Sequence, residues 1–533
     1  MNIYLWGVVI SILLYLLAGF YAGRKVKNIE DYYVSGRNAS TFLITGTMFA
    51  SMLSINGFMG DTAYAYNGHI TSIVLINTIC ACGYIIGPLL FGRFIRRAKV
   101  NTMPSYFFKR FNSIRIKRFA GIVTVISLSA YFLSVIKGTS ILMESLTGFN
   151  ETIALLLSWG CIMIFTLYSG SKGVILTDTI MCIFFLCITI IAGSYVFNST
   201  GGVSNLVSNL VNNPLAPDGI LSYKGSSDNS VFYAITMGII WMITVSVSPW
   251  QAGRNLMAKN EHVIFRSGVL TALLTVLFLF YLYLIAISII QINPNMHKPE
   301  EVIIWAAYKT MPEIIGMLLL TGIMAAGLSS ASTFLSVVSF SISSDILDVK
   351  FKDEKKQLNF TRVVLFTFSI VILIIAYYNI LSIRVIAWFA STVIAASWGY
   401  VAFASVWSKK LTERGAFYAM FSGFITFIFA KLLKEYFNLP LENFLDPFFI
   451  ATFMSILCGI LGSRNQIKTK EEIIFQTNLH IVPKKESKIS DYKKDKTFAW
   501  IIILSGILIS ILLIKYWAFA YEDAINLKLS MQN

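Results

Sequence analysis

Charged residues and histidines are scarce in this chain. Only 13% of its 533 residues are charged and four are histidine, whereas 56% are hydrophobic. Soluble folds do not bury so large an apolar share, so the composition excludes a soluble globular protein and indicates a polytopic membrane protein. The net charge of +16 is spread over separate loops, and we therefore expect no nucleic-acid partner.

Cysteines and histidines form no cluster that would carry chemistry. All six cysteines fall within apolar runs and lack the spacing of zinc ligands, so we expect neither disulfides nor a zinc site. The histidines lie in loops or near the ends of apolar runs. An enzyme acting inside the membrane would need a nucleophile with its base, or metal ligands, at depth. The chain is therefore predicted not to be an enzyme.

Long apolar runs predict about fourteen transmembrane helices, centred near residues 13, 50, 82, 130, 160, 185, 243, 277, 327, 369, 396, 425, 454 and 508. Lysine and arginine are dense in alternate loops, for example at 93–118 and 484–496, and scarce in the loops between them. The positive-inside rule places the dense loops in the cytoplasm. With an even number of spans, both the N-terminus and the C-terminus are then predicted outside.

Two apolar runs contain residues that interrupt a helix. The second run carries Ser54, Asn56 and Gly57 near its middle, and the seventh meets Pro249, which lacks a backbone donor. Non-helical backbone at membrane depth is tolerated only where it lines a cavity or is buried in protein. By our count the interruptions lie five spans apart, in corresponding places of two five-span units. Such paired breaks indicate the binding site of an inverted-repeat transporter.

The run from Met324 to Thr333 carries four hydroxyls among small residues. On a helix, Ala326, Ser329 and Ser330 share one face, and Ser332 and Thr333 extend the pattern by one turn. Hard cations bind through oxygen ligands, and small side chains let an ion approach backbone carbonyls. The run is a candidate sodium site. The alternative interpretation is that its small residues only permit close packing of helices.

Four features together resemble the sodium/solute symporter family, which includes proline, sialic acid and sugar symporters. They are the Ala-Ala-x-x-Ser-Ser pattern that begins at Ala325, the broken helix ending Phe58-Met-Gly-x5-Tyr66, the Leu-Thr-Asp-Thr-Ile element around Asp178, and the basic segment 251–259. The resemblance implies an all-α polytopic membrane protein with a leucine-transporter-like core of five plus five helices in inverted repeat. It also implies transport by alternating access.

The resemblance divides the chain into three regions. Residues 1–40 would form a first transmembrane helix and a cytoplasmic loop. Residues 41–408 would form the ten-helix core, with one repeat at about 41–198 and the other at about 231–408. Residues 409–533 would form accessory helices with a basic cytoplasmic loop at 462–497.

The resemblance also implies ion sites. The sodium site shared by the family corresponds to the backbone carbonyls of Ala50, Leu53 and Ala326 and the hydroxyls of Ser329 and Ser330. A second sodium, found in the sialic-acid branch, would be held by residues matching Asp178, Ser329, Ser332 and Thr333. Proton coupling through the aspartate is the alternative to this second site.

The two breaks and the span between them are expected to enclose a solute cavity. Its expected lining is Ser54, Asn56, Gly57, Tyr131, Trp241, Val245 and Pro249. Tyr131, Trp241 and Pro249 match the proline-transporting branch, whereas Val245 replaces a tyrosine of that branch and puts proline in doubt. Lys137 and Asp61 either pair as a gate, or Lys137 attracts a substrate carboxylate.

These features predict a symporter that imports a small organic solute with Na⁺ as the coupling ion and without an organic cofactor. An amino acid or a monocarboxylate is favoured as the solute. The alternatives are a sodium-coupled sugar or sialic acid symporter and a transporter-like membrane sensor. The expected partners are the solute, sodium ions as the sole metal, and the lipid bilayer of the cell membrane.

Overall fold

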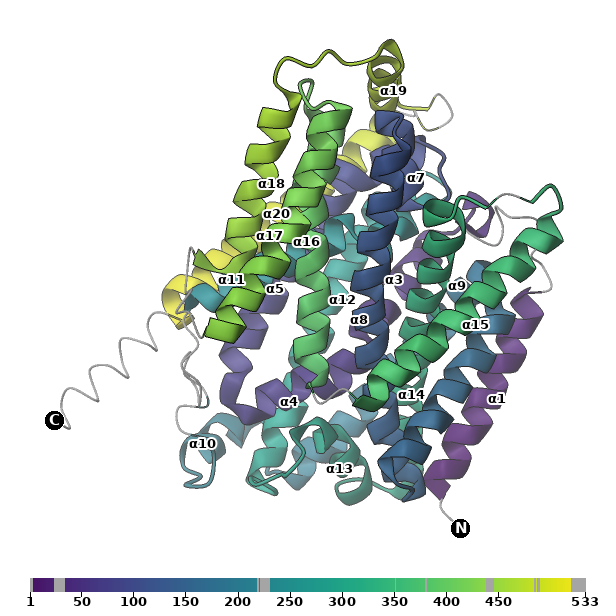
Figure 1. The fold of residues 1–533 in the computed structure, drawn as a ribbon. Coiled ribbons are helices and arrows are strands. Elements are labelled where there is room, and N and C mark those ends of the chain that lie inside the picture. Colours follow the sequence, from purple (N-terminus) through teal and green to yellow (C-terminus); the bar gives the residue numbers. More distant parts are fainter. Residues whose placement is uncertain are drawn as a thin grey trace.

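The computed structural model describes residues 3–23, 34–217, 220, 231–349, 351–378, 381–437, 445–483, 486 and 489–518. Within these residues the backbone is helical, and apart from one isolated bridge between Ala39 and Ala258 no strand pairing occurs. The helices stand side by side in one bundle (Figure 1). The two ends of the chain, whose outside location was predicted, lie beyond the described residues.

The bundle is built from helices of very different lengths. The longer ones are α1 (Ile3–Gly23), α3 (Thr41–Ile55), α5 (Ile70–Gly87), α7 (Met103–Phe111), α8 (Ile114–Thr147), α9 (Glu151–Ser199), α11 (Val231–Val247), α12 (Glu261–Ser288), α13 (Val302–Lys309), α14 (Glu313–Phe340), α15 (Glu354–Tyr378), α16 (Ile383–Trp407), α17 (Glu413–Phe437), α18 (Pro447–Ser463), α19 (Lys470–His480) and α20 (Ile489–Leu512). Short segments that matter for the site are η2 (Asn56–Asp61), α4 (Thr62–Tyr64), α6 (Arg93–Arg97) and η6 (Ala252–Met257).

Ten helical stretches of the described chain are long and apolar enough to cross a membrane, judged by length and composition. The first of them, Thr41–Arg97, contains two of the predicted spans, because the chain turns at α4 between α3 and α5 (Figure 1). Three shorter apolar helices, Ile3–Leu17, Glu151–Leu167 and Pro447–Ser463, coincide with three more predicted spans. The prediction of an all-α polytopic membrane protein is confirmed, and the count of about fourteen stays a prediction.

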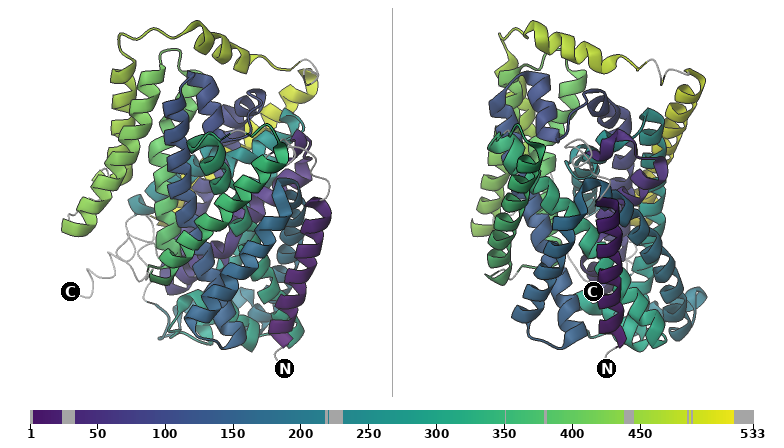
Figure 2. Two further views of the ribbon diagram at one scale, coloured as in Figure 1. Left: turned by 45° about the vertical axis from the view of Figure 1, so that its right-hand side comes forward. Right: turned by 90° about the vertical axis from the view of Figure 1, so that its right-hand side faces the viewer.

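The centre and the edge of the bundle differ in what their helices contact. In the centre, α14 packs against α3, α8 and α9, and from Leu319 to Leu335 every residue of α14 is buried. The hairpin of α17 and α18 stands at the edge (Figure 2) and exposes large apolar side chains such as Phe429, Phe453 and Ile460. Such an apolar periphery matches a lipid environment, since lipid tails are as apolar as these side chains.

Both predicted helix interruptions are present. Ser54 adopts φ 50° and ψ −177°, a conformation that is uncommon for a residue with a side chain and that ends the regular turn of α3. At the second interruption, α11 ends at Val247, and Pro249 lies in the non-helical stretch before η6. The amide of Gln251 joins the two breaks, because it donates to the carbonyl oxygen of Met48 at 3.2 Å and to Oγ of Ser51 at 3.3 Å.

Close packing of α5 against α11 holds the second break in place and gives a first prediction. A Cβ atom on Gly83 would lie 2.3 Å from the carbonyl oxygen of Met242 and 2.5 Å from Cγ2 of Val245. We therefore expect Gly83→Val to force α11 outward and to destabilise the protein by about 1–3 kcal/mol. Thermal unfolding in detergent measures this effect. Gly160→Val is the matched control, since a Cβ atom there has nothing within 4 Å. Equal unfolding temperatures for the two variants would contradict the prediction.

Candidate functional site

The predicted sodium-site residues lie where α3 packs against α14. Ala50, Leu53, Ala326, Ser329 and Ser330 are each at most 1% exposed. α3 ends here because of the break at Ser54, and beyond the break the backbone N–H of Asn56 donates to the carbonyl oxygen of Leu53. The hydroxyl of Ser330 approaches the carbonyl oxygen of Ser51 at 3.5 Å, which joins the two helices. The structure thus places the two predicted residues of α3 and the three of α14 on a pair of helices that pack together.

Several oxygen atoms at this interface lack hydrogen-bond partners. Within the described residues, Oγ of Ser54 and Oδ1 of Asn56 are buried and unpaired, and the hydroxyl of Ser329 is buried beside the carboxyl of Asp178. An unpaired buried polar group costs about 1–3 kcal/mol, so such groups are usually satisfied by a ligand or by water. Because oxygen atoms are the ligands that hard cations prefer, the residues fit a sodium ion.

A second polar cluster lies beside the first, around Asp178 of α9. The side chain of Asp178 is fully buried; its Oδ2 accepts a hydrogen bond of 2.6 Å from Thr47 and lies 3.5 Å from Nη2 of Arg254. The same Nη2 donates to Oγ1 of Thr333 at 2.7 Å. Ser329 also lies near the carboxyl of Asp178. Ser332, the remaining residue predicted for a second sodium, donates to the carbonyl of Ser329 within its own helix.

Sequence analysis did not place Arg254 at this cluster. A detectable signal was present, since Arg254 follows the second helix break by a few residues and an aspartate, Asp178, lies inside another apolar run. Charged residues within membrane spans are usually paired with one another. That rule could have suggested the pair, although two residues so far apart in the chain can be joined only by the fold.

A cavity lies at the break of α3, and four of the seven residues predicted for the solute cavity line it. They are Ser54, Asn56, Tyr131 and Trp241, and the remaining lining residues are Ser51, Met52, Asp61, Ile73, Ile76, Asn77, Trp250, Phe334, Arg384, Ala387 and Trp388. The other three predicted residues lie elsewhere. Gly57 faces Leu53 and Leu279, Val245 packs among apolar residues against α5, and Pro249 lines a second cavity.

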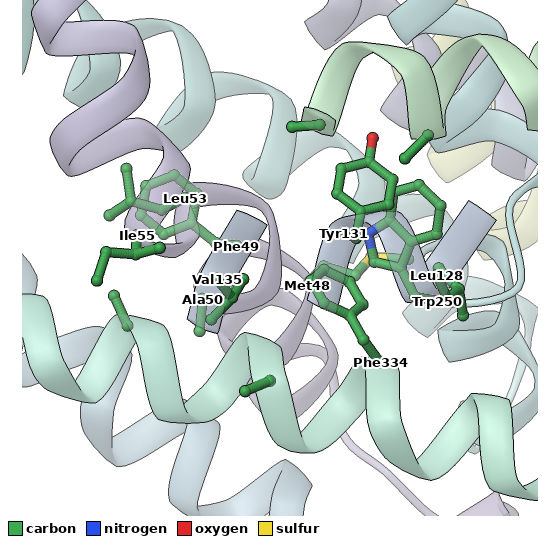
Figure 3. Close-up of a cluster of buried hydrophobic side chains, with 14 of the residues drawn as sticks. Met48, Phe49, Ala50, Leu53, Ile55, Leu128, Tyr131, Val135, Trp250 and Phe334 are labelled. Carbon is green, nitrogen blue, oxygen red and sulfur yellow. The ribbon is translucent and has the colours of Figure 1, made fainter. Parts of the chain in front are cut away.

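Three aromatic rings pack together where the two cavities share a lining residue. The ring of Tyr131 lies 4.7 Å from that of Trp250 and 5.2 Å from that of Phe334, measured between centroids. Figure 3 shows the three side chains in contact, next to Met48 and Leu128. Trp250 lines both cavities, and the second one reaches residues 101–104 at the start of α7. Trp250 therefore lies between the two cavities.

The cavity contains an arginine and an aspartate that were not predicted to pair. The guanidinium of Arg384 lies over the ring of Tyr64 at 3.1 Å and over that of Trp388 at 4.0 Å. The carboxyl of Asp61 is close enough to interact electrostatically with Arg384. One nitrogen of Arg384, Nη1, is buried without a hydrogen-bond partner among the described residues. Lys137, proposed as the partner of Asp61, instead donates to the carbonyl of Leu381 and is not part of the lining.

Two broken helices that meet beside an oxygen-lined pocket in an all-helical bundle define an ion-coupled membrane transporter. Residues 32–423 match the model of the sodium:solute symporter family, and the chain belongs to this family. The predicted family is confirmed, and with it a multi-pass, sodium-coupled symporter rather than an enzyme.

Named relatives cover almost the whole chain at low identity. The chain is 23% identical to the high-affinity proline transporter PutP of Bacillus subtilis, over 83% of this chain and 94% of that protein. It is also 23% identical to a sodium/pantothenate symporter of Haemophilus influenzae, over 88% and 99%. Among solved structures, a Na⁺-coupled sialic acid symporter in a substrate-bound outward-open state matches with a TM-score of 0.70 and 18% identity, over 88% of this chain and 99% of that chain. This last likeness shows the shared fold.

Proposed function

We propose that this chain imports a small organic solute bearing a carboxylate, coupled to inward flow of Na⁺, by alternating access. The observation that carries the solute class is the buried, unpaired Nη1 of Arg384 in an aromatic-walled cavity. Guanidinium groups bind carboxylates with paired hydrogen bonds. Arg384 thereby takes the role that the sequence had suggested for Lys137. Proline, pantothenate and sialic acid, which the names of the relatives mention, all carry a carboxylate.

We assign the coupling ion to the backbone carbonyls of Ala50, Leu53 and Ala326 and the hydroxyls of Ser329 and Ser330. The support is the burial of all five residues and the unpaired oxygens of Ser54 and Asn56 at the adjoining break of α3. Because the break at Ser54 borders both this site and the cavity, an ion there would hold the broken end of α3 against α14 and so shape the cavity for the solute. Moving one Na⁺ inward supplies about 2.3 kcal/mol at 100 mV and about 1.4 kcal/mol more for a tenfold gradient.

We further propose that the protein lies in the cell membrane and crosses it about fourteen times. Its three regions would be a first helix and loop at residues 1–40, the transport core at 41–408 and the accessory helices at 409–533. The orientation follows from charge, since the basic segments α6 and α7 lie near α19 at one end of the bundle, opposite α4 and α13 (Figure 1). The positive-inside rule makes that end cytoplasmic.

Uptake into proteoliposomes tests the proposed function. With an inward Na⁺ gradient, we expect an amino acid or a carboxylic acid from a solute panel to accumulate, and we expect accumulation to vanish when K⁺ replaces Na⁺. Liposomes without protein are the control. Sodium-driven uptake of a neutral sugar with no response to acids would overturn the carboxylate assignment. Uptake driven by a proton gradient without Na⁺ would overturn the coupling ion, and no uptake of any solute would favour a sensor.

A further inference from the structure

Arg254 is buried where two oxygen-bearing side chains of the predicted second sodium site converge. Only 4% of its surface is exposed. η6, which follows the break at Pro249, carries Arg254 between α9 and α14, so that one nitrogen reaches both Asp178 and Thr333. These contacts, at 3.5 Å and 2.7 Å, bring a fixed positive charge to the oxygens that would otherwise coordinate a cation.

A buried carboxylate needs a compensating positive charge, because desolvation otherwise disfavours its charged form. Thr47 supplies a hydrogen bond to Asp178 but no charge. Among the described residues, the guanidinium of Arg254 supplies that charge. A sodium ion placed against the same carboxylate would lie within a few ångströms of the guanidinium, and two positive charges at that distance repel strongly in a poorly solvated interior.

We propose that Arg254 is a tethered cation that takes the place of a second sodium ion, so that this chain binds one Na⁺ per molecule. The inference rests on the proposed sodium site at Ser329 and Ser330, and it adds the residue that decides the number of ions. The second cavity, which both Arg254 and Thr333 line, gives an ion a route to the carboxylate of Asp178 once the guanidinium is removed.

Equilibrium binding of radioactive sodium to the purified protein, without solute, tests this inference independently of transport. We expect one Na⁺ per wild-type molecule and two per molecule of Arg254→Gln, because the variant leaves Asp178 without its cation. Arg254→Lys keeps a positive charge and should bind one ion. Adding Asp178→Asn to Arg254→Gln should return the number to one. Arg266→Gln is the control, since Arg266 is largely exposed and pairs with Asp495, and it should bind one ion.

The number of sodium ions bound per molecule distinguishes a failure of the role proposed for Arg254 from a failure of the proposed sodium site. Two ions on the wild-type protein, or one ion on a folded Arg254→Gln protein, would overturn the role of Arg254 while leaving the sodium site at Ser329 intact. No ion on the wild-type protein would overturn the proposed sodium site and this inference with it. If Arg254→Gln fails to fold, Arg254→Met serves the same comparison, because it fills the space without a charge.

Discussion

Uptake by the double variant Ser329→Ala, Ser330→Ala should require at least about 100-fold more Na⁺ for half-maximal rate than wild type does. Each interaction between a polar group and a charged one contributes about 1.5–3 kcal/mol, and 1.4 kcal/mol corresponds to a factor of ten. Removing two of the five proposed oxygen ligands therefore suffices for this loss. The fold should survive, since alanine is smaller than serine and favours helices. Initial rates of uptake across a sodium titration measure the effect.

A matched control lies further along the same helix. Ser336 and Ser339 are also buried on α14, and the hydroxyl of Ser339 donates to the carbonyl of Ser336 within that helix. Replacing both with alanine removes two buried hydroxyls without touching the proposed ion ligands. We expect this control to keep the wild-type sodium dependence. An unchanged sodium dependence in the Ser329 and Ser330 variant would show that the ion binds elsewhere.

Replacing Arg384 with glutamine should raise the KM for the carboxylate solute by at least about 100-fold, with a much smaller change in apparent sodium affinity. Truncating one partner of a buried, hydrogen-bonded charge pair costs about 2–5 kcal/mol. Glutamine keeps a hydrogen-bond donor but loses the charge and the paired geometry of the guanidinium. Arg384→Lys restores the charge alone, so we expect it to recover only part of the affinity. Solute titrations at saturating Na⁺ measure the effect.

Lys137→Gln is the control for this second prediction. Lys137 lies outside the cavity lining and contacts the carbonyl of Leu381. Its substitution should leave the KM within about twofold of wild type, because surface substitutions away from buried networks have small effects. A larger effect at Lys137 than at Arg384 would instead identify Lys137 as the cation that attracts the carboxylate.

The class of fold and the places where helices break could be predicted from the order of residues in the chain. Hydropathy predicted a polytopic bundle, because apolar runs of sufficient length are stable only in a bilayer. The break at Pro249 follows from local chemistry, since proline lacks the backbone donor that a helix needs, and the break near Ser54 is favoured by Asn56 and Gly57, residue types of low helix propensity. The face shared by Ala326, Ser329 and Ser330 follows from helical periodicity alone.

Which polar groups meet depends on how the helices pack, and no local pattern in the sequence predicted it. The hypothesis of an Asp61–Lys137 pair rested on nearness to the same membrane face, whereas packing brings Arg384 to Asp61 and turns Lys137 toward a backbone carbonyl. Likewise, Arg254 reaches Asp178, Trp250 and Phe334 pack against Tyr131, and Val245 packs among apolar residues instead of lining the cavity. The physical reason is that each of these outcomes depends on the rotation of one helix relative to another, and residues far apart in the chain carry no local pattern that reveals that rotation.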